Sequence, residues 1–182
     1  MRVSIVISAI AACVLTPSMM AAQSRPLSFG VSGGASVPMS GLSDVVDIGY
    51  GVAGHVYMRP AMMGQIMGRG DVSYDRWNGK NSSKEHISSL AAVGNVVIPF
   101  AESMASARPY FVAGVGLYRF DQSYMVTGIR LSSASNNFGL QFGGGFEFTL
   151  AELSTYLEAK YVNVFSDGKN SGYLPITFGV RF

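Results

Sequence analysis

From residue 27 to the end of the chain, apolar and polar positions alternate with a period of two. The clearest stretch is residues 137–148, in which Phe138, Leu140, Phe142, Phe146 and Phe148 alternate with Asn137, Gly139, Gln141, Gly143, Gly145 and Glu147. Such alternation places one set of side chains on each face of a β-strand. Similar stretches predict eight strands, at residues 27–37, 49–59, 65–74, 86–100, 110–120, 137–148, 154–165 and 173–182.

The connections between these strands differ in length. Residues 38–48, 77–85, 121–136 and 166–172 are polar and mostly long, whereas residues 60–64 and 150–153 are short; residues 101–109 depart from this rule by being rather long. About 20 residues per strand and connection suit tilted strands of about 9–11 residues that cross a membrane, with loops on one side and turns on the other. The pattern therefore predicts an all-β protein, an eight-stranded antiparallel up-and-down transmembrane barrel.

The distribution of charge indicates which face of the strands points outward. Charges of both signs fall in mid-strand on the polar face, where a narrow interior lets them pair and glycine gives them room. Aromatic residues gather near strand ends, as in the interface girdles of membrane barrels: Tyr50, Tyr57, Tyr74, Trp77, Phe100, Tyr110, Tyr118, Tyr161 and Phe165. The apolar face should therefore contact lipid. The alternative is a soluble sandwich or lipocalin-like barrel with its apolar face inside.

An inward polar face predicts a network of side chains inside the barrel. We expect this network to comprise Arg69, Asp71, Gln141, Glu147, Glu158, Lys160 and Arg181, with Gln65 and Tyr156 as further fillers. Eight strands leave an interior only about wide enough for side chains, so these residues should plug it.

Composition supports a membrane location. Only 13% of the residues are charged, compared with about 25% in soluble domains. A formal charge of +2 without a basic run gives no indication of a nucleic-acid partner. Outside the N-terminus no apolar run is long enough for a membrane-spanning helix.

The N-terminus has the features of a secretory signal peptide. Arg2 precedes an uncharged apolar run that ends at Leu15, and small residues follow at Ala21 and Ala22. We expect a cleaved signal peptide at residues 1–23 and one barrel domain at residues 24–182. Cys13, the only cysteine, would be removed with the signal peptide. In the alternative, residues 10–13 form a lipoprotein signal and Cys13 carries the lipid.

The C-terminal sequence YLPITFGVRF, residues 173–182, alternates and ends on Phe182. It resembles the assembly signal of the bacterial outer-membrane β-barrel superfamily that includes OmpX and the OmpA transmembrane domain. Residues 108–118 and 157–161 also resemble segments of this family. The resemblance implies an outer-membrane location, contact with outer-membrane lipid and lipopolysaccharide, and dependence on periplasmic chaperones and the assembly machinery. We expect a monomer, with Phe182 as the assembly signal. Pro175 departs from the pattern and should delay regular pairing of the last strand.

Motifs with catalytic potential are few. Residues 30–34 match G-x-S-x-G, but they lie within an alternating strand instead of the strand-to-helix elbow that this motif requires. His86 and Ser88 resemble part of the His-x-Ser pair of barrel-type lipid A deacylases, without the flanking Arg and Asn. His55, the other histidine, is expected at a satisfied interior or rim position. It has no ligand-like spacing to His86 or to carboxylates, so no metal or cofactor site is indicated. We therefore expect a non-enzymatic protein with a structural or surface-interaction role, whose extracellular loops bind a ligand that the sequence does not name. The alternatives are a lipid A-modifying enzyme that uses His86 and Ser88, and a small pore.

Overall fold

The computed structural model describes residues 27–60, 64–80, 82–100, 107–126, 129–150, 153–166 and 170–182. The predicted signal peptide and Cys13 lie outside these ranges. The eight strands are β1 (Leu27–Met39), β2 (Gly49–Met58), β3 (Met67–Gly79), β4 (Ser82–Pro99), β5 (Arg108–Val126), β6 (Ile129–Leu150), β7 (Leu153–Phe165) and β8 (Ser171–Arg181). No helix in these ranges is long and apolar enough to cross a membrane.

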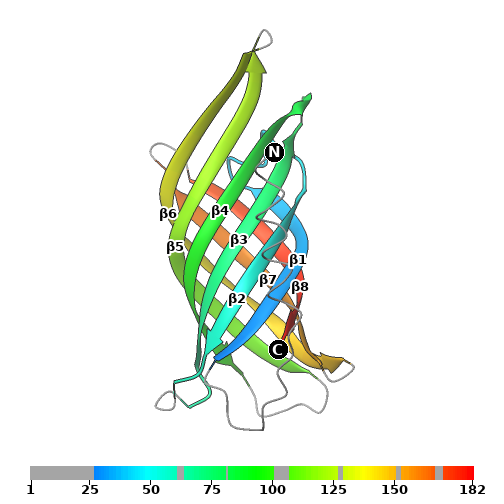
Figure 1. Cartoon of the computed structure of the whole chain (residues 1–182), viewed down its shortest axis with the longest axis vertical. Coiled ribbons are helices and arrows are strands. Elements are labelled where there is room, and N and C mark those ends of the chain that lie inside the picture. The colour runs from blue at the N-terminus through cyan, green and yellow to red at the C-terminus, as the bar shows by residue number, and fades with distance from the viewer. Residues whose placement is uncertain are drawn as a thin grey trace, which may run out of the picture.

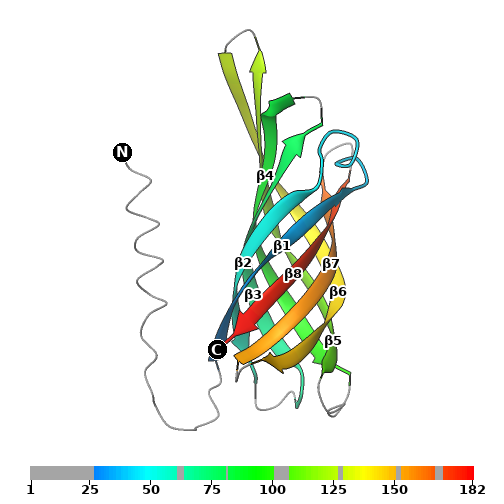
Figure 2. The same cartoon turned by 90° about the vertical axis from the view of Figure 1, so that its right-hand side faces the viewer.

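Each strand pairs antiparallel with its neighbours in sequence, and β1 pairs with β8 to close the barrel. Figure 2 shows this closure, with β1 in blue beside β8 in red. The predicted eight-stranded up-and-down barrel is thereby confirmed. We call the end where β1 begins and β8 ends the turn end, and the opposite end, which holds the β5–β6 hairpin, the loop end (Figure 1).

Two predicted loops are largely strand. The pairing of β3 with β4 continues to Gly79 and Ser82, within predicted loop 77–85. The pairing of β5 with β6 continues to Val126 and Ile129, through most of predicted loop 121–136, and forms the tall hairpin of Figure 1. A strand ladder is made by backbone groups, which pair with or without apolar side chains. The alternation of apolar and polar residues therefore stops where the outer apolar belt ends, whereas the paired strands continue beyond the belt.

The outer face of the barrel is apolar. Leu117 is 66% exposed, Val72 60% and Phe142 53%, and outward side chains of the same kind occur on all eight strands. A monomeric soluble protein rarely exposes so large a continuous apolar surface. The alternating apolar residues thus point outward, as predicted, and the soluble-barrel alternative is wrong.

Pro175 disturbs the sheet less than predicted. It pairs with Ser36 of β1, and the residues before it in β8 pair with β1 as well. Between β7 and β8, regular pairing stops at Ile176 and resumes at Tyr173, so the gap is local. Proline removes a single N–H donor, which affects the ladder on one side only.

The interior of the loop end is filled by an apolar cluster. Residues 40–48 fold over the barrel and bury Leu42 and Val46 against Trp77 and Tyr173. Val46 bridges to Gly79, and the Trp77 indole donates to the Ser36 carbonyl at 3.0 Å. This cluster closes the loop end with side chains and a folded loop.

The predicted aromatic girdle is only partly correct. Tyr50, Tyr74, Phe100 and Phe165 are exposed on the outer face. Four others are buried inside the barrel: Tyr57, Trp77, Tyr110 and Tyr118. Their positions alternate with the outward residues of their own strands, so the period of two, and not their nearness to strand ends, determines their face.

Candidate functional site: the polar interior

The centre of the barrel holds four buried charges. Arg69 of β3 donates two hydrogen bonds to Glu158 of β7, at 2.7 and 3.0 Å, and one to Asp71 at 3.0 Å. Lys160 lies 3.2 Å from Glu158 Oε1 and 3.4 Å from Asp71 Oδ2. The Tyr110 hydroxyl donates to Glu158 at 2.9 Å. Two cations thus face two anions, an arrangement that compensates for the loss of hydration of each charge.

A chain of neutral groups extends this network around the wall. Asn95 of β4 donates to Asp71 Oδ2 at 3.0 Å. Gln141 of β6 donates to the Asn95 side-chain oxygen and accepts a 3.3 Å hydrogen bond from Tyr118 of β5. These groups give Asp71 and one another hydrogen-bond partners, as buried polar atoms require.

Ser32, His55 and Asp71 form the hydrogen bonds of a Ser-His-Asp triad. Ser32 Oγ lies 2.9 Å from His55 Nε2, and His55 Nδ1 lies 2.7 Å from Asp71 Oδ1. A triad also needs N–H donors that are free to bind an oxyanion. Ser32 instead lies inside a regular strand, paired with Ala53 on one side and Gly179 on the other. We therefore interpret the Ser32–His55 contact as part of the interior network.

Glu147 and Arg181 form a second polar group near the turn end. Arg181 of β8 is ion-paired with Glu147 of β6, and Ser154 donates to the same carboxylate at 2.7 Å. The Arg181 guanidinium lies 5.3 Å from the ring centroid of Tyr57, within the range of a cation–π contact. The seven residues predicted as one network thus lie in two groups, one central and one at the turn end.

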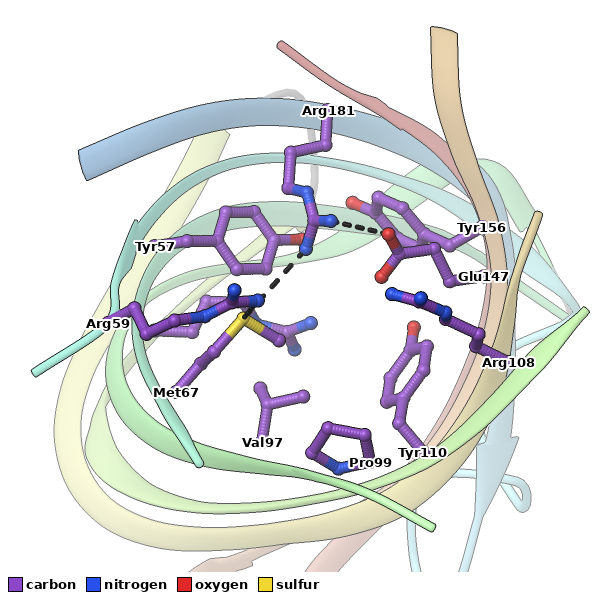
Figure 3. A pocket seen from close by; sticks show the side chains of 11 residues that line it. Tyr57, Arg59, Met67, Val97, Pro99, Arg108, Tyr110, Glu147, Tyr156 and Arg181 are labelled. Atoms are coloured by element: carbon purple, nitrogen blue, oxygen red, sulfur yellow. Dashed lines mark hydrogen bonds and ion pairs between the residues drawn. The ribbon is translucent and has the colours of Figure 1, made fainter. Parts of the chain in front are cut away.

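A small cavity of about 40 Å³ lies beside this second group (Figure 3). Its lining consists of Tyr57, Arg59, Met67, Arg69, Val97, Pro99, Arg108, Tyr110, Glu147, Tyr156 and Arg181. Four of the eleven are arginines and one is a carboxylate, so the lining is strongly basic.

Phe182 lies at the junction that closes the barrel. Its backbone exchanges two hydrogen bonds of 2.9 Å with Phe29 of β1, one in each direction. Its ring is 56% exposed. The last residue therefore continues the β1–β8 ladder and presents an apolar side chain at the turn end.

Three residues considered in the sequence lie away from the interior. Gln65 is exposed in the turn before β3, so its prediction as an interior filler is wrong, because regular pairing begins only at Met67. His86 and Ser88 flank Ile87 in β4, and Ile87 packs against the interior loop-end cluster. The alternation of the strand assigns His86 and Ser88 to the outer side, near the loop end.

The predicted interior network did not include several residues that face inward: Asn95, Tyr110 and Tyr118. All three occupy inward positions of the period-two pattern, so the pattern could have identified them. Tyr110 and Tyr118 were instead predicted in the aromatic girdle, because they lie near strand ends. Within the described ranges, no cluster of His, Cys, Asp and Glu could hold a metal ion.

Comparisons with known proteins agree with this architecture. A family model described as outer membrane protein β-barrel domain matches residues 9–182. Neisserial surface protein A is 15% identical over 86% of this chain and 96% of its own, with a TM-score of 0.66. Ail, the attachment invasion locus protein of Yersinia pestis, is 16% identical over 86% and 97%, with a TM-score of 0.53.

The outer membrane enzyme PagL is 23% identical over 84% of this chain and 98% of its own, with a TM-score of 0.51. The comparison with curated proteins finds no significant match. At these identities the structural similarities show the fold alone, whereas the family model covers nearly the whole chain. The chain therefore belongs to the outer membrane protein β-barrel family, and its apolar belt faces the lipid of a bacterial outer membrane.

Proposed function

We propose that this protein is a non-enzymatic surface-interaction barrel that binds an extended segment of a partner protein at the edge of its β5–β6 hairpin. The observation that carries the proposal is the difference in length between β6 and its neighbour. Pairing of β6 with β5 covers residues 129–147, but pairing of β6 with β7 begins only at Phe138 and Phe165. Within the described chain, residues 129–137 of β6 thus have one edge without a partner strand.

An unpaired strand edge offers a row of N–H and C=O groups to another chain. An extended peptide can add to such an edge as a further strand, with main-chain hydrogen bonds supplying the affinity. The edge here carries small and polar side chains, from Ser132 to Asn137, and those of residues 133–136 are exposed. Small side chains leave the backbone accessible, which favours docking of a second strand.

The proposed orientation places the loop end outside the cell and both barrel termini in the periplasm. An even number of strands returns the chain to the side on which it started. Two structural neighbours are named as a surface protein and as an attachment and invasion protein. Those names support a role at the cell surface and identify no partner for this chain.

The same fold also occurs in PagL, which is named as an enzyme. The alternative function, lipid A modification by His86 and Ser88, is therefore tested directly. Lipid A extracted from cells that express the protein should keep all its acyl chains under our proposal. If lipid A loses an acyl chain and this loss requires Ser88, the protein is an enzyme and the proposed binding function is wrong.

Orientation is tested with epitope tags on intact cells. A tag inserted at Lys80, between β3 and β4, should bind antibody without permeabilisation. A tag inserted between Leu150 and Leu153, in the turn between β6 and β7, should bind antibody only after permeabilisation. The reverse result would contradict the proposed orientation.

The strand-addition proposal is tested with neighbouring proline variants, Ser132→Pro and Ser133→Pro. Adjacent N–H groups of a strand point to opposite edges, so one variant loses a hydrogen bond to β5 and the other loses only an edge donor. Ten-residue peptides can be selected from a random display library for binding to the wild-type protein in nanodiscs. These peptides should not bind the edge variant, which is the one that loses only an edge donor. That variant should still fold, because its hydrogen bonds to β5 are intact. Such peptides should also protect the edge amides of residues 129–137 from hydrogen exchange. Peptides that bind the edge variant as well as wild type would contradict strand addition.

A further inference from the structure

The cavity at the turn end is surrounded by guanidinium groups from separate parts of the barrel wall. Arg59 follows β2, Arg108 begins β5 and Arg181 ends β8. Figure 3 shows these three side chains directed toward the same opening from different sides, with Arg108 and Arg181 beside Glu147 and Arg59 beside Met67. Strands that are distant in sequence thus bring three permanent positive charges to one small space.

The charge of this cavity is only partly balanced. Arg181 is paired with Glu147, which is the only carboxylate among the described residues of the lining. Arg59 contacts Met67 Sδ at 3.4 Å, and within the described chain neither Arg59 nor Arg108 is ion-paired. Arg69 also reaches the lining, but Asp71 and Glu158 already neutralise it. Three guanidiniums therefore share one carboxylate.

A buried hydroxyl points to the same space. Tyr156 lines the cavity and is only 3% exposed. Its hydroxyl forms no hydrogen bond of acceptable geometry within the described residues, although Tyr57 and Ser32 lie near it. Buried hydroxyls normally have a partner. Because Tyr57 and Ser32 lie close to it, the Tyr156 hydroxyl is a polar group of the lining and not a free donor.

We propose that the turn-end cavity binds a compact phosphate-type oxyanion. Guanidinium forks bind phosphate oxygens through charge-assisted hydrogen bonds. A cavity of about 40 Å³ holds about three water-sized groups, enough for the head of a phosphate. Donors from three sides suit a tetrahedral anion better than a carboxylate, whose two oxygens one arginine can satisfy.

The proposal is tested by titrating the full-length barrel, in neutral detergent, with inorganic phosphate at constant ionic strength against chloride. Calorimetry should show saturable binding at one site. Arg108→Gln and Arg59→Gln should each weaken it about tenfold, the usual effect of losing one charge-assisted hydrogen bond. Arg119→Gln removes the same charge from an exposed site on the outer wall and should leave the affinity unchanged. Glu147→Gln should tighten binding, because it removes the competing carboxylate.

The source of the phosphate is distinguished in nanodiscs. If phosphatidylglycerol nanodiscs suppress phosphate binding and phosphatidylcholine nanodiscs do not, the natural ligand is a lipid headgroup. If binding is equal in both, the ligand is a free periplasmic anion, and either result supports the site. Absence of saturable binding in detergent and in both nanodiscs would overturn the proposal. Equal weakening by Arg108→Gln and Arg119→Gln would also overturn it, because the attraction would then come from net charge alone.

Discussion

Replacing Glu158 by glutamine tests whether the central network stabilises the barrel. The change keeps the size of the side chain and removes one negative charge. Arg69 then keeps only Asp71 as an anionic partner, and Lys160 must share that same carboxylate. Two cations would face one anion in a space from which water is largely excluded.

The expected cost follows from the burial of these groups. The side chains of Arg69 and Glu158 are each 1% exposed. Removing one partner of a buried pair costs about 3–5 kcal/mol. At a urea dependence of about 2 kcal/mol per molar, the unfolding midpoint should fall by about 2 M. The matched control is Asp121→Asn, which breaks a pair with Arg119 whose side chains are 53% and 48% exposed, and it should cost less than about 1 kcal/mol.

Unfolding can be followed with the fluorescence of Trp77, the only tryptophan, which is fully buried. Reversible urea titrations in lipid vesicles should show the shift for Glu158→Gln and almost none for Asp121→Asn. Adding Lys160→Met to Glu158→Gln restores one cation and one anion, and should recover part of the lost stability. If Glu158→Gln unfolds at the same urea concentration as Asp121→Asn, the central charges do not stabilise the barrel.

Three further predictions concern assembly, packing and conductance. Phe182→Asp should prevent assembly, so that no heat-modifiable band appears on gels of outer membranes, whereas Phe100→Asp, at another exposed turn-end phenylalanine, should still assemble. Gly179→Ala should cost about 1–3 kcal/mol of unfolding free energy, because its Cβ would overlap the ring of Tyr156; Gly94→Ala, which meets no atom within 4 Å, should be neutral in the same urea titration. Purified wild-type protein in planar bilayers should give no stable porin-sized conductance steps, since side chains fill the interior; such steps would show that the interior opens.

The period-two pattern was sufficient to predict the architecture. It gave the number of strands, the lipid-facing side and the inward position of Arg69, Asp71, Glu158 and Lys160, because alternate side chains of a strand point to opposite faces. The same pattern placed His55 on the polar face, where it was expected at an interior or rim position. Chain length and connection lengths then favoured a closed up-and-down barrel.

Only the tertiary structure determined which inward residues meet. Arg69 and Glu158 are 89 positions apart, and they pair because closure of the barrel brings β3 opposite β7 at matching height. Sequence alternation defines a face but not the register between strands, so it did not separate Glu147 and Arg181 from the central group. It also did not reveal the length of the β5–β6 hairpin, since backbone pairing there continues without an apolar face. Height along the barrel and distance across its interior are properties of the closed sheet, and these decide where the polar groups of this protein can act.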